Sequence, residues 1–126
     1  MALRELGIEG ACYGQNPEIH MYSDWNGDYN CANLRFPELL KRLDVDWNSF
    51  TYLDLGSGKG KSLLMAAELP FRRIIGVEFS PKLVSIAHKN LAKQRNFRIE
   101  CSNIQLVRQD ATTYEFPNYP LVIYSF

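Results

Sequence analysis

Cysteine is scarce in this chain, and its spacing argues against the sites that cysteines usually build. The 126 residues contain three cysteines, Cys12, Cys31 and Cys101, with no CxxC pair, and only two histidines. An odd number of widely spaced cysteines is typical of reduced structural thiols rather than of a disulfide framework. Cys12, His20 and Cys31 also match no spacing of zinc ligands. We therefore expect no metal site.

An excess of positive charge and a long apolar segment are absent as well. Lysine and arginine together number 14, as do aspartate and glutamate, so the chain has no general attraction to nucleic acid or to an anionic membrane. The N-terminus lacks the apolar core of a secretory signal, and no apolar run approaches the roughly 18 residues of a membrane span. We expect a cytoplasmic protein without membrane contact. A protein or a small molecule is favoured over nucleic acid as its partner.

The chain changes character near residue 48. Residues 1–48 contain an irregular segment rich in Gly, Asn, Asp and Tyr, followed by a short helix predicted over residues 36–44. From residue 49 onward, apolar segments at 50–56, 72–79, 104–111 and 121–126 predict strands, and helical periodicity appears at 61–69 and 80–95. This order predicts an α/β fold, a Rossmann-like parallel sheet with helices on both faces. The predicted domains are a cover, 1–48, and a ligand-binding domain, 49–126.

A glycine-rich loop, YLDLGSGKGKS at residues 52–62, joins the first predicted strand to a helix. Such a loop presents bare amides and a helix N-terminus to a ligand. Two nucleotide-binding patterns fit it poorly: the P-loop GxxxxGK[ST] needs glycine where Leu55 stands, and GxGxxG needs a small residue where Lys61 stands. A third pattern, acidic-x-Gly-x-Gly-x-Gly, is complete, with Asp54 followed by three glycines.

Two further carboxylates follow later predicted strands. Glu78 ends the second strand, 18 positions after Gly60, close to the roughly 20-residue spacing at which a carboxylate binds ribose hydroxyls. Asp110 ends the third predicted strand. The carboxyl ends of parallel strands lie at one edge of a sheet, so Asp54, Glu78 and Asp110 are expected to form one pocket rim. Carboxylates there favour a cationic ligand with an unphosphorylated ribose.

With these residues the chain resembles the class I S-adenosylmethionine-dependent methyltransferases, whose first motif has this acidic and glycine pattern. Residues 53–91 resemble a subgroup of mostly unassigned substrate with a DLGSGKGR-like loop and a GVEFSP-like strand, and more loosely the nucleosome-lysine methyltransferases that lack the SET fold. Lys61 stands where the subgroup has arginine. The resemblance implies S-adenosylmethionine as cofactor and the following binding residues: Asp54, Gly56, Ser57, Gly58, Gly60, Glu78, Phe79, Asp110 and Ala111.

The resemblance also implies what each part of the chain does. Asp110 and the amide of Ala111 would read the adenine ring, and the strand order would be 3-2-1-4. In the resembled fold the sheet continues beyond its fourth strand into the segment that meets the methyl acceptor, so we expect a chain truncated after that strand. The acceptor and the catalytic residues stay unassigned, and an inactive binding or interaction module is the alternative. The apolar edge at residues 121–126 predicts self-association.

Several of these residues also have structural explanations that the sequence leaves open. The alternatives are that Asp54 caps the following helix, that Glu78 is a surface carboxylate, and that Asp110 is a turn residue. Phe79 either stacks on adenine or belongs to the core.

Some charged and aromatic side chains have no assigned role. Lys59 and Lys61 are expected to point to water, with contact between Lys61 and a ligand or substrate carboxylate as the alternative. His88 is expected on the solvated side of its helix. Aromatic residues of the N-terminal segment either line a substrate entrance or anchor that segment; these are Tyr13, Tyr22, Trp25 and Tyr29. The resemblance relates Tyr22 to a segment that covers the cofactor in relatives.

Overall fold

A computed structural model describes residues 36–93 and 98–125 of the chain. The chain divides into two compact units, residues 1–43 and 44–126, and each is described by itself. In the first unit the structure describes helix α2 (Phe36–Leu40), with Pro37 in its first turn. The helix is shorter than predicted, because the amides of Arg42 and Leu43 bond to carbonyls three residues back, in tighter turns than an α-helix makes. Leu43 is accordingly 41% exposed and does not extend the buried face.

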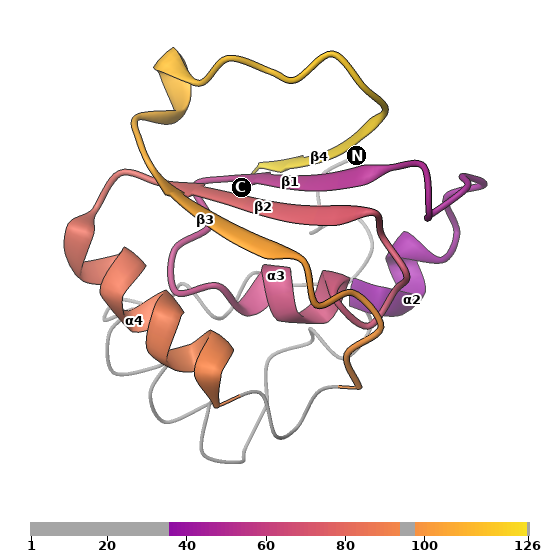
Figure 1. Ribbon diagram of the computed structural model, residues 1–126, viewed down its shortest axis with the longest axis horizontal. Coiled ribbons are helices and arrows are strands. Elements are labelled where there is room, and N and C mark those ends of the chain that lie inside the picture. The colour runs from indigo at the N-terminus through magenta and orange to yellow at the C-terminus, as the bar shows by residue number, and fades with distance from the viewer. Residues whose placement is uncertain (1–35, 94–97, 126) are drawn as a thin grey trace. The chain divides into compact units, whose positions relative to one another are not determined.

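The second unit is built on one sheet of four parallel strands (Figure 1). The strands are β1 (Thr51–Leu55), β2 (Arg73–Glu78), β3 (Ile104–Arg108) and β4 (Leu121–Ser125), in the order β3-β2-β1-β4. β1 lies in the middle and pairs with β2 on one side and with β4 on the other. The predicted fold class and strand order are confirmed.

Helical segments cover the two faces of the sheet in different ways (Figure 1). Helices α3 (Lys61–Ala66) and α4 (Pro81–Ala92) follow β1 and β2 and lie on the same face. The connection from β3 to β4, with the short 3-10 helix η4 (Ala111–Thr113), crosses the opposite face. There Tyr114 and Ala111 pack against the apolar cluster of Leu53, Ile75 and Val77. The carboxyl ends of the strands therefore have α3 and α4 on one side and this connection on the other.

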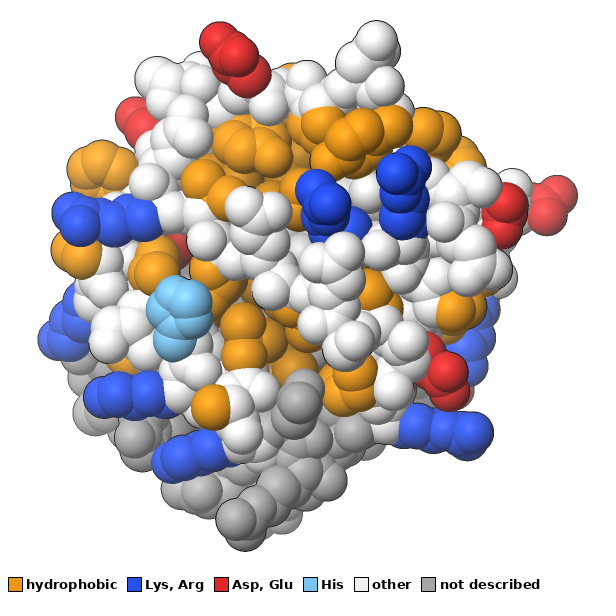
Figure 2. Space-filling model, viewed as in Figure 1, with side chains coloured by type: hydrophobic (Ala, Val, Ile, Leu, Met, Phe, Trp, Pro, Cys, Tyr) orange, Lys and Arg blue, Asp and Glu red, His pale blue; other side chains and the backbone are white. Residues whose placement is uncertain are grey.

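The sequence explains why α4 begins and how it is oriented. Ser80 caps the helix by accepting a hydrogen bond from the amide of Leu83 at 3.3 Å, and Pro81 occupies the first helical position. Lysine side chains and the predicted solvated His88 are exposed along α4, and they stand out on the surface in Figure 2. Ala87 and Asn90 are buried on the opposite side. The amphipathic pattern predicted from the sequence is confirmed.

β4 is an edge strand within the part of the chain that the structure describes. It pairs with β1 through Leu121 to Ser125, and Ile123 is 51% exposed. Self-association through this edge stays a prediction. None of the helices among the described residues is long and apolar enough to cross a membrane.

Candidate functional site

The glycine loop leaves the carboxyl end of β1 and enters α3 through three left-handed glycines. Gly56, Gly58 and Gly60 have φ values of 83°, 55° and 85°, a region that other residues rarely adopt. The loop is tied to the neighbouring strand, because the amides of Gly56 and Ser57 both donate to the carbonyl of Val77, at 2.8 and 3.0 Å. The glycines are therefore required by the backbone path itself, in addition to the close ligand approach predicted from the sequence.

Glu78, the last residue of β2, holds the middle of this loop. Its Oε2 accepts a hydrogen bond from the amide of Gly58 at 2.9 Å, and its Oε1 accepts one from the amide of Ser80 at 2.8 Å. The side chain is half-buried. The alternative that Glu78 is merely a surface carboxylate is wrong, because both of its oxygens have backbone partners at the loop and at the start of α4.

Asp54 is a carboxylate in the interior of the unit, with 1% of its surface exposed. Its Oδ2 accepts a hydrogen bond from the hydroxyl of Ser62 in α3. Burial raises the pKa of Asp54 from 3.8 to about 7; the Ser62 bond opposes this rise, and the negative charge of Glu78 adds to it. The residue at the N-cap of α3 is Gly60, without a side-chain cap, so the alternative that Asp54 caps this helix is wrong.

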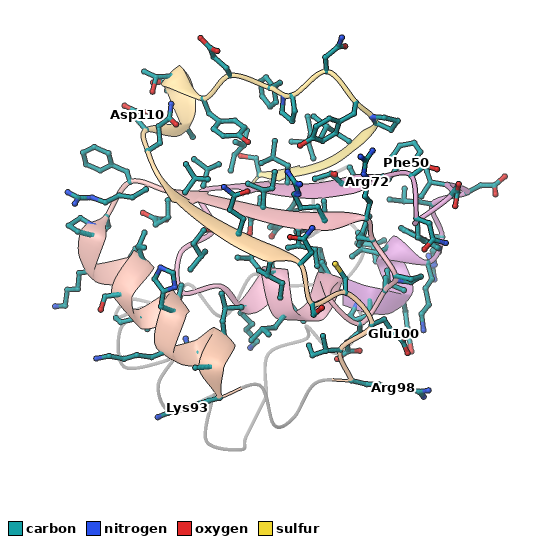
Figure 3. The ribbon with its side chains drawn as sticks, in the orientation of Figure 1. Phe50, Arg72, Lys93, Arg98, Glu100 and Asp110 are labelled. Atoms are coloured by element: carbon teal, nitrogen blue, oxygen red, sulfur yellow. The ribbon has the colours of Figure 1, made fainter. Side chains whose placement is uncertain are left out.

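Asp110 lies at the turn into η4 (Figure 3). β3 ends two residues before it, so the strand is shorter than predicted and does not include Asp110. Its Oδ1 accepts hydrogen bonds from the amide and the hydroxyl of Thr112, at 2.8 and 2.7 Å. These bonds lower the pKa of Asp110, which is fully exposed. The turn role considered for Asp110 is therefore present. The neighbouring Gln109 amide bonds to the carbonyl of Glu78, which places Asp110 beside the end of β2.

The structure corrects the expectations for three further side chains, and other predicted residues lie outside the part that it describes. Phe79 is 71% exposed, so the core alternative is wrong and adenine stacking stays a prediction. Lys59 and Lys61 are only 2% and 5% exposed, so the expectation that they point to water is wrong. Their neighbours are buried with them: Ser57 to Gly60 and every residue of α3 are buried, so this segment does not form an outer surface. The candidate metal residues Cys12, His20 and Cys31, and the aromatic residues at positions 13, 22, 25 and 29, lie outside the described residues.

Two residues of the site were missed by the sequence reasoning. Gly76 in β2 lies directly under the loop: a Cβ atom there would be 2.7 Å from Ser57 Oγ and 2.6 Å from Leu63 Cδ1. Asn90 in α4 donates from Nδ2 to the carbonyl of Lys59 at 3.0 Å. Both carried a signal, since an isolated glycine in a strand indicates close backbone approach and an amide on an apolar helix face needs a partner.

A sequence model of the methyltransferase domain family matches residues 53–126, which is more than half of the chain. The match begins inside β1 and includes the glycine loop from Leu53 onward, together with β2, β3 and β4. Comparison with curated proteins gives no significant match.

Solved structures that are similar to this chain include methyltransferases. An RNA methyltransferase from Salinibacter ruber in complex with S-adenosyl-L-homocysteine is 27% identical, with a TM-score of 0.52 over 69% of this chain and 54% of that chain. An S-adenosylmethionine-dependent methyltransferase from Clostridium acetobutylicum is 19% identical, with a TM-score of 0.60 over 87% of this chain and 42% of that chain. The chain thus spans about half the length of these structures or less.

Proposed function

The chain belongs to the methyltransferase domain family, and we propose that it binds S-adenosylmethionine at the carboxyl edge of the sheet for methyl transfer to an acceptor. The observation that carries the proposal is the arrangement around the glycine loop. Asp54 lies beneath the loop and Glu78 holds it at Gly58. The similarity to the Salinibacter ruber enzyme, whose structure contains S-adenosyl-L-homocysteine, supports the same cofactor class.

The residues at this edge fit such a ligand. Asp54 Oδ1 and Ser57 Oγ are buried, and neither has a hydrogen-bond partner among the residues that the structure describes. Buried polar atoms are normally satisfied, so two unsatisfied ones in one motif indicate that a further group binds there. A Cβ atom at Gly56 would meet nothing within 4 Å, so there is open space next to the loop. A carboxylate two residues before this open position suits a cationic ligand with hydroxyl groups.

We assign the proposed binding roles as follows. The Asp54 charge complements the cationic part of the cofactor, and Glu78 accepts hydrogen bonds from ribose hydroxyls. Phe79 stacks on the adenine ring, while Asp110 and the amide of Ala111 read its edge. The loop residues Gly56, Ser57, Gly58 and Gly60 line the remainder of the site. When bound, the cofactor supplies an activated methyl group, and the residues of this chain bind and orient it.

The other proposals concern the rest of the protein. Residues 1–48 are proposed to form the cover and residues 49–126 the cofactor-binding part of a cytoplasmic enzyme. The acceptor class favoured by the balanced charge is a protein or small molecule. The alternative is a module that binds the cofactor without transferring its methyl group. A screen of methyl acceptors with labelled S-adenosylmethionine separates the two functions.

Calorimetric titration tests the proposed binding. We expect S-adenosylmethionine and S-adenosylhomocysteine to bind more tightly than NAD or ATP. Glu78→Ala should weaken their binding by roughly ten- to a hundred-fold, because a charge-assisted hydrogen bond contributes about 1.5–3 kcal/mol. Glu115→Ala, at an exposed glutamate between η4 and β4, is the matched control and should bind as the unchanged chain does. Preference for NAD or ATP would contradict the proposal.

A further inference from the structure

Asn90 is a buried amide in the last turn of α4, with 3% of its surface exposed. Its Nδ2 donates to the carbonyl of Lys59 in the glycine loop at 3.0 Å, across 31 residues of sequence. Asparagine is a poor helix former, and burying an amide is unfavourable unless it is hydrogen-bonded. An apolar residue would therefore suit α4 better. The hydrogen bond of Asn90 goes to the glycine loop, which indicates that the residue acts on that loop.

A second contact from α4 reaches the next residue of the loop. Ala87, one turn before Asn90, lies so close to Gly60 that a Cβ atom built on Gly60 would be 3.3 Å from Ala87 Cβ. Two small residues allow this approach, and Asn90 then reaches the preceding carbonyl. Two residues on one face of α4 thus contact two consecutive residues of the loop.

The loop is consequently held by two different elements at two adjacent residues. From β2, Glu78 accepts the amide of Gly58, and from α4, Asn90 donates to the carbonyl of Lys59. Left-handed glycines are conformationally permissive, so a loop built from them keeps one conformation only where outside contacts restrain it. Holding a binding loop in its bound conformation improves affinity, because less entropy is lost when the ligand binds.

We infer that Asn90 is a positioning residue of the cofactor site. Its amide orders the glycine loop for binding, and it acts through the loop rather than by contact with the cofactor. The inference rests on the proposed function only for the identity of the ligand. Loss of the amide should remove this bond to the Lys59 carbonyl and release the loop. The sheet, which has its own ladders of hydrogen bonds, should remain.

Two measurements on the whole chain test this inference. Asn90→Leu keeps the branched shape of the side chain and removes the donor, Asn90→Ser shortens the side chain, and Asn118→Leu at an exposed asparagine is the control. Without ligand, hydrogen exchange should accelerate about tenfold or more at the amides of Gly58 and Gly60 in both Asn90 variants, with the β1 amides unchanged. Titration with S-adenosylhomocysteine should show about tenfold weaker binding, the size expected for one lost buried hydrogen bond.

The outcomes are distinguishable. Exchange that accelerates evenly over loop and sheet, or binding equal to that of the unchanged chain, would overturn the inference. If the unchanged chain binds neither S-adenosylmethionine nor S-adenosylhomocysteine, the proposed function fails, and the exchange measurement alone decides whether Asn90 positions the loop. If Asn90→Leu does not fold, Asn90→Ser decides by the same two measurements.

Discussion

Replacing Asp54 by asparagine should make this protein more stable at alkaline pH. Asp54 is buried, and burial raises its pKa to about 7, so the folded protein keeps a proton there that the unfolded chain, with a value near 3.8, has already released. Between these two pH values the folded state binds more protons than the unfolded state, and stability must therefore fall as the pH rises. Above about pH 7 the folded protein carries a buried negative charge, and its full cost is present.

The magnitude follows from the difference between the two pKa values. At about 1.4 kcal/mol per pH unit, the difference between 3.8 and about 7 corresponds to about 4 kcal/mol. Asparagine has nearly the same shape, carries no charge, and can still accept the hydrogen bond from the Ser62 hydroxyl. Asp54→Asn should therefore match the unchanged protein near pH 4. By pH 8 it should exceed it by ~4 kcal/mol in free energy of unfolding.

Denaturant unfolding of both proteins from pH 4 to pH 8 measures this difference. The chain offers a matched control in Asp46, an exposed aspartate that accepts a hydrogen bond from the Ser49 hydroxyl at 2.5 Å. Asp46→Asn should change stability by only about 0.5 kcal/mol or less, as surface substitutions usually do. A difference between Asp54→Asn and the unchanged protein that stays constant with pH would refute the reasoning. An Asp54→Asn variant that becomes less stable than the unchanged protein as the pH rises toward 8 would refute it as well.

The same substitution links stability to the proposed function. A buried carboxylate that lowers stability at neutral pH is the type of group that functional sites retain. A cationic ligand beside Asp54 would offset the cost of its charge. We therefore expect Asp54→Asn to bind S-adenosylmethionine more weakly than the unchanged protein at pH 8, although it folds more stably.

Two further predictions concern the elements that build the site. Gly76→Ala should lower the free energy of unfolding by about 1–3 kcal/mol in denaturant unfolding, because its new methyl group would overlap Ser57 and Leu63; an unchanged midpoint would show that the loop yields without cost. Ser80→Ala removes the cap of α4 and should cost about 1 kcal/mol in thermal unfolding followed by circular dichroism. Ser85→Ala, at an exposed position in the same helix, is its control, and equal effects in the two variants would argue against the cap.

Local sequence patterns were sufficient to predict the strands, α3, α4 and the loop. The apolar segments at 50–56 and 72–79 each contain one observed strand, β1 and β2, and the Ser80-Pro81 pair predicted where α4 begins. These features depend on hydrogen bonds and side-chain periodicity over a few residues, and both are set by the local sequence. The same locality explains the error at α2, where a sequence pattern compatible with nine helical residues yields five.

By itself the sequence determined the α/β class, the order of the strands along the chain and the acidic and glycine motif of the loop. Only the tertiary structure decided which side chains meet. It buried Lys59 and Lys61, exposed Phe79, and joined Asn90 to the loop across 31 residues. Periodicity states which face of an element is apolar, but the partner of that face depends on how the parallel crossovers stack helices on the sheet. Burial and long-range hydrogen bonds are properties of that stacking, so no local pattern contains them.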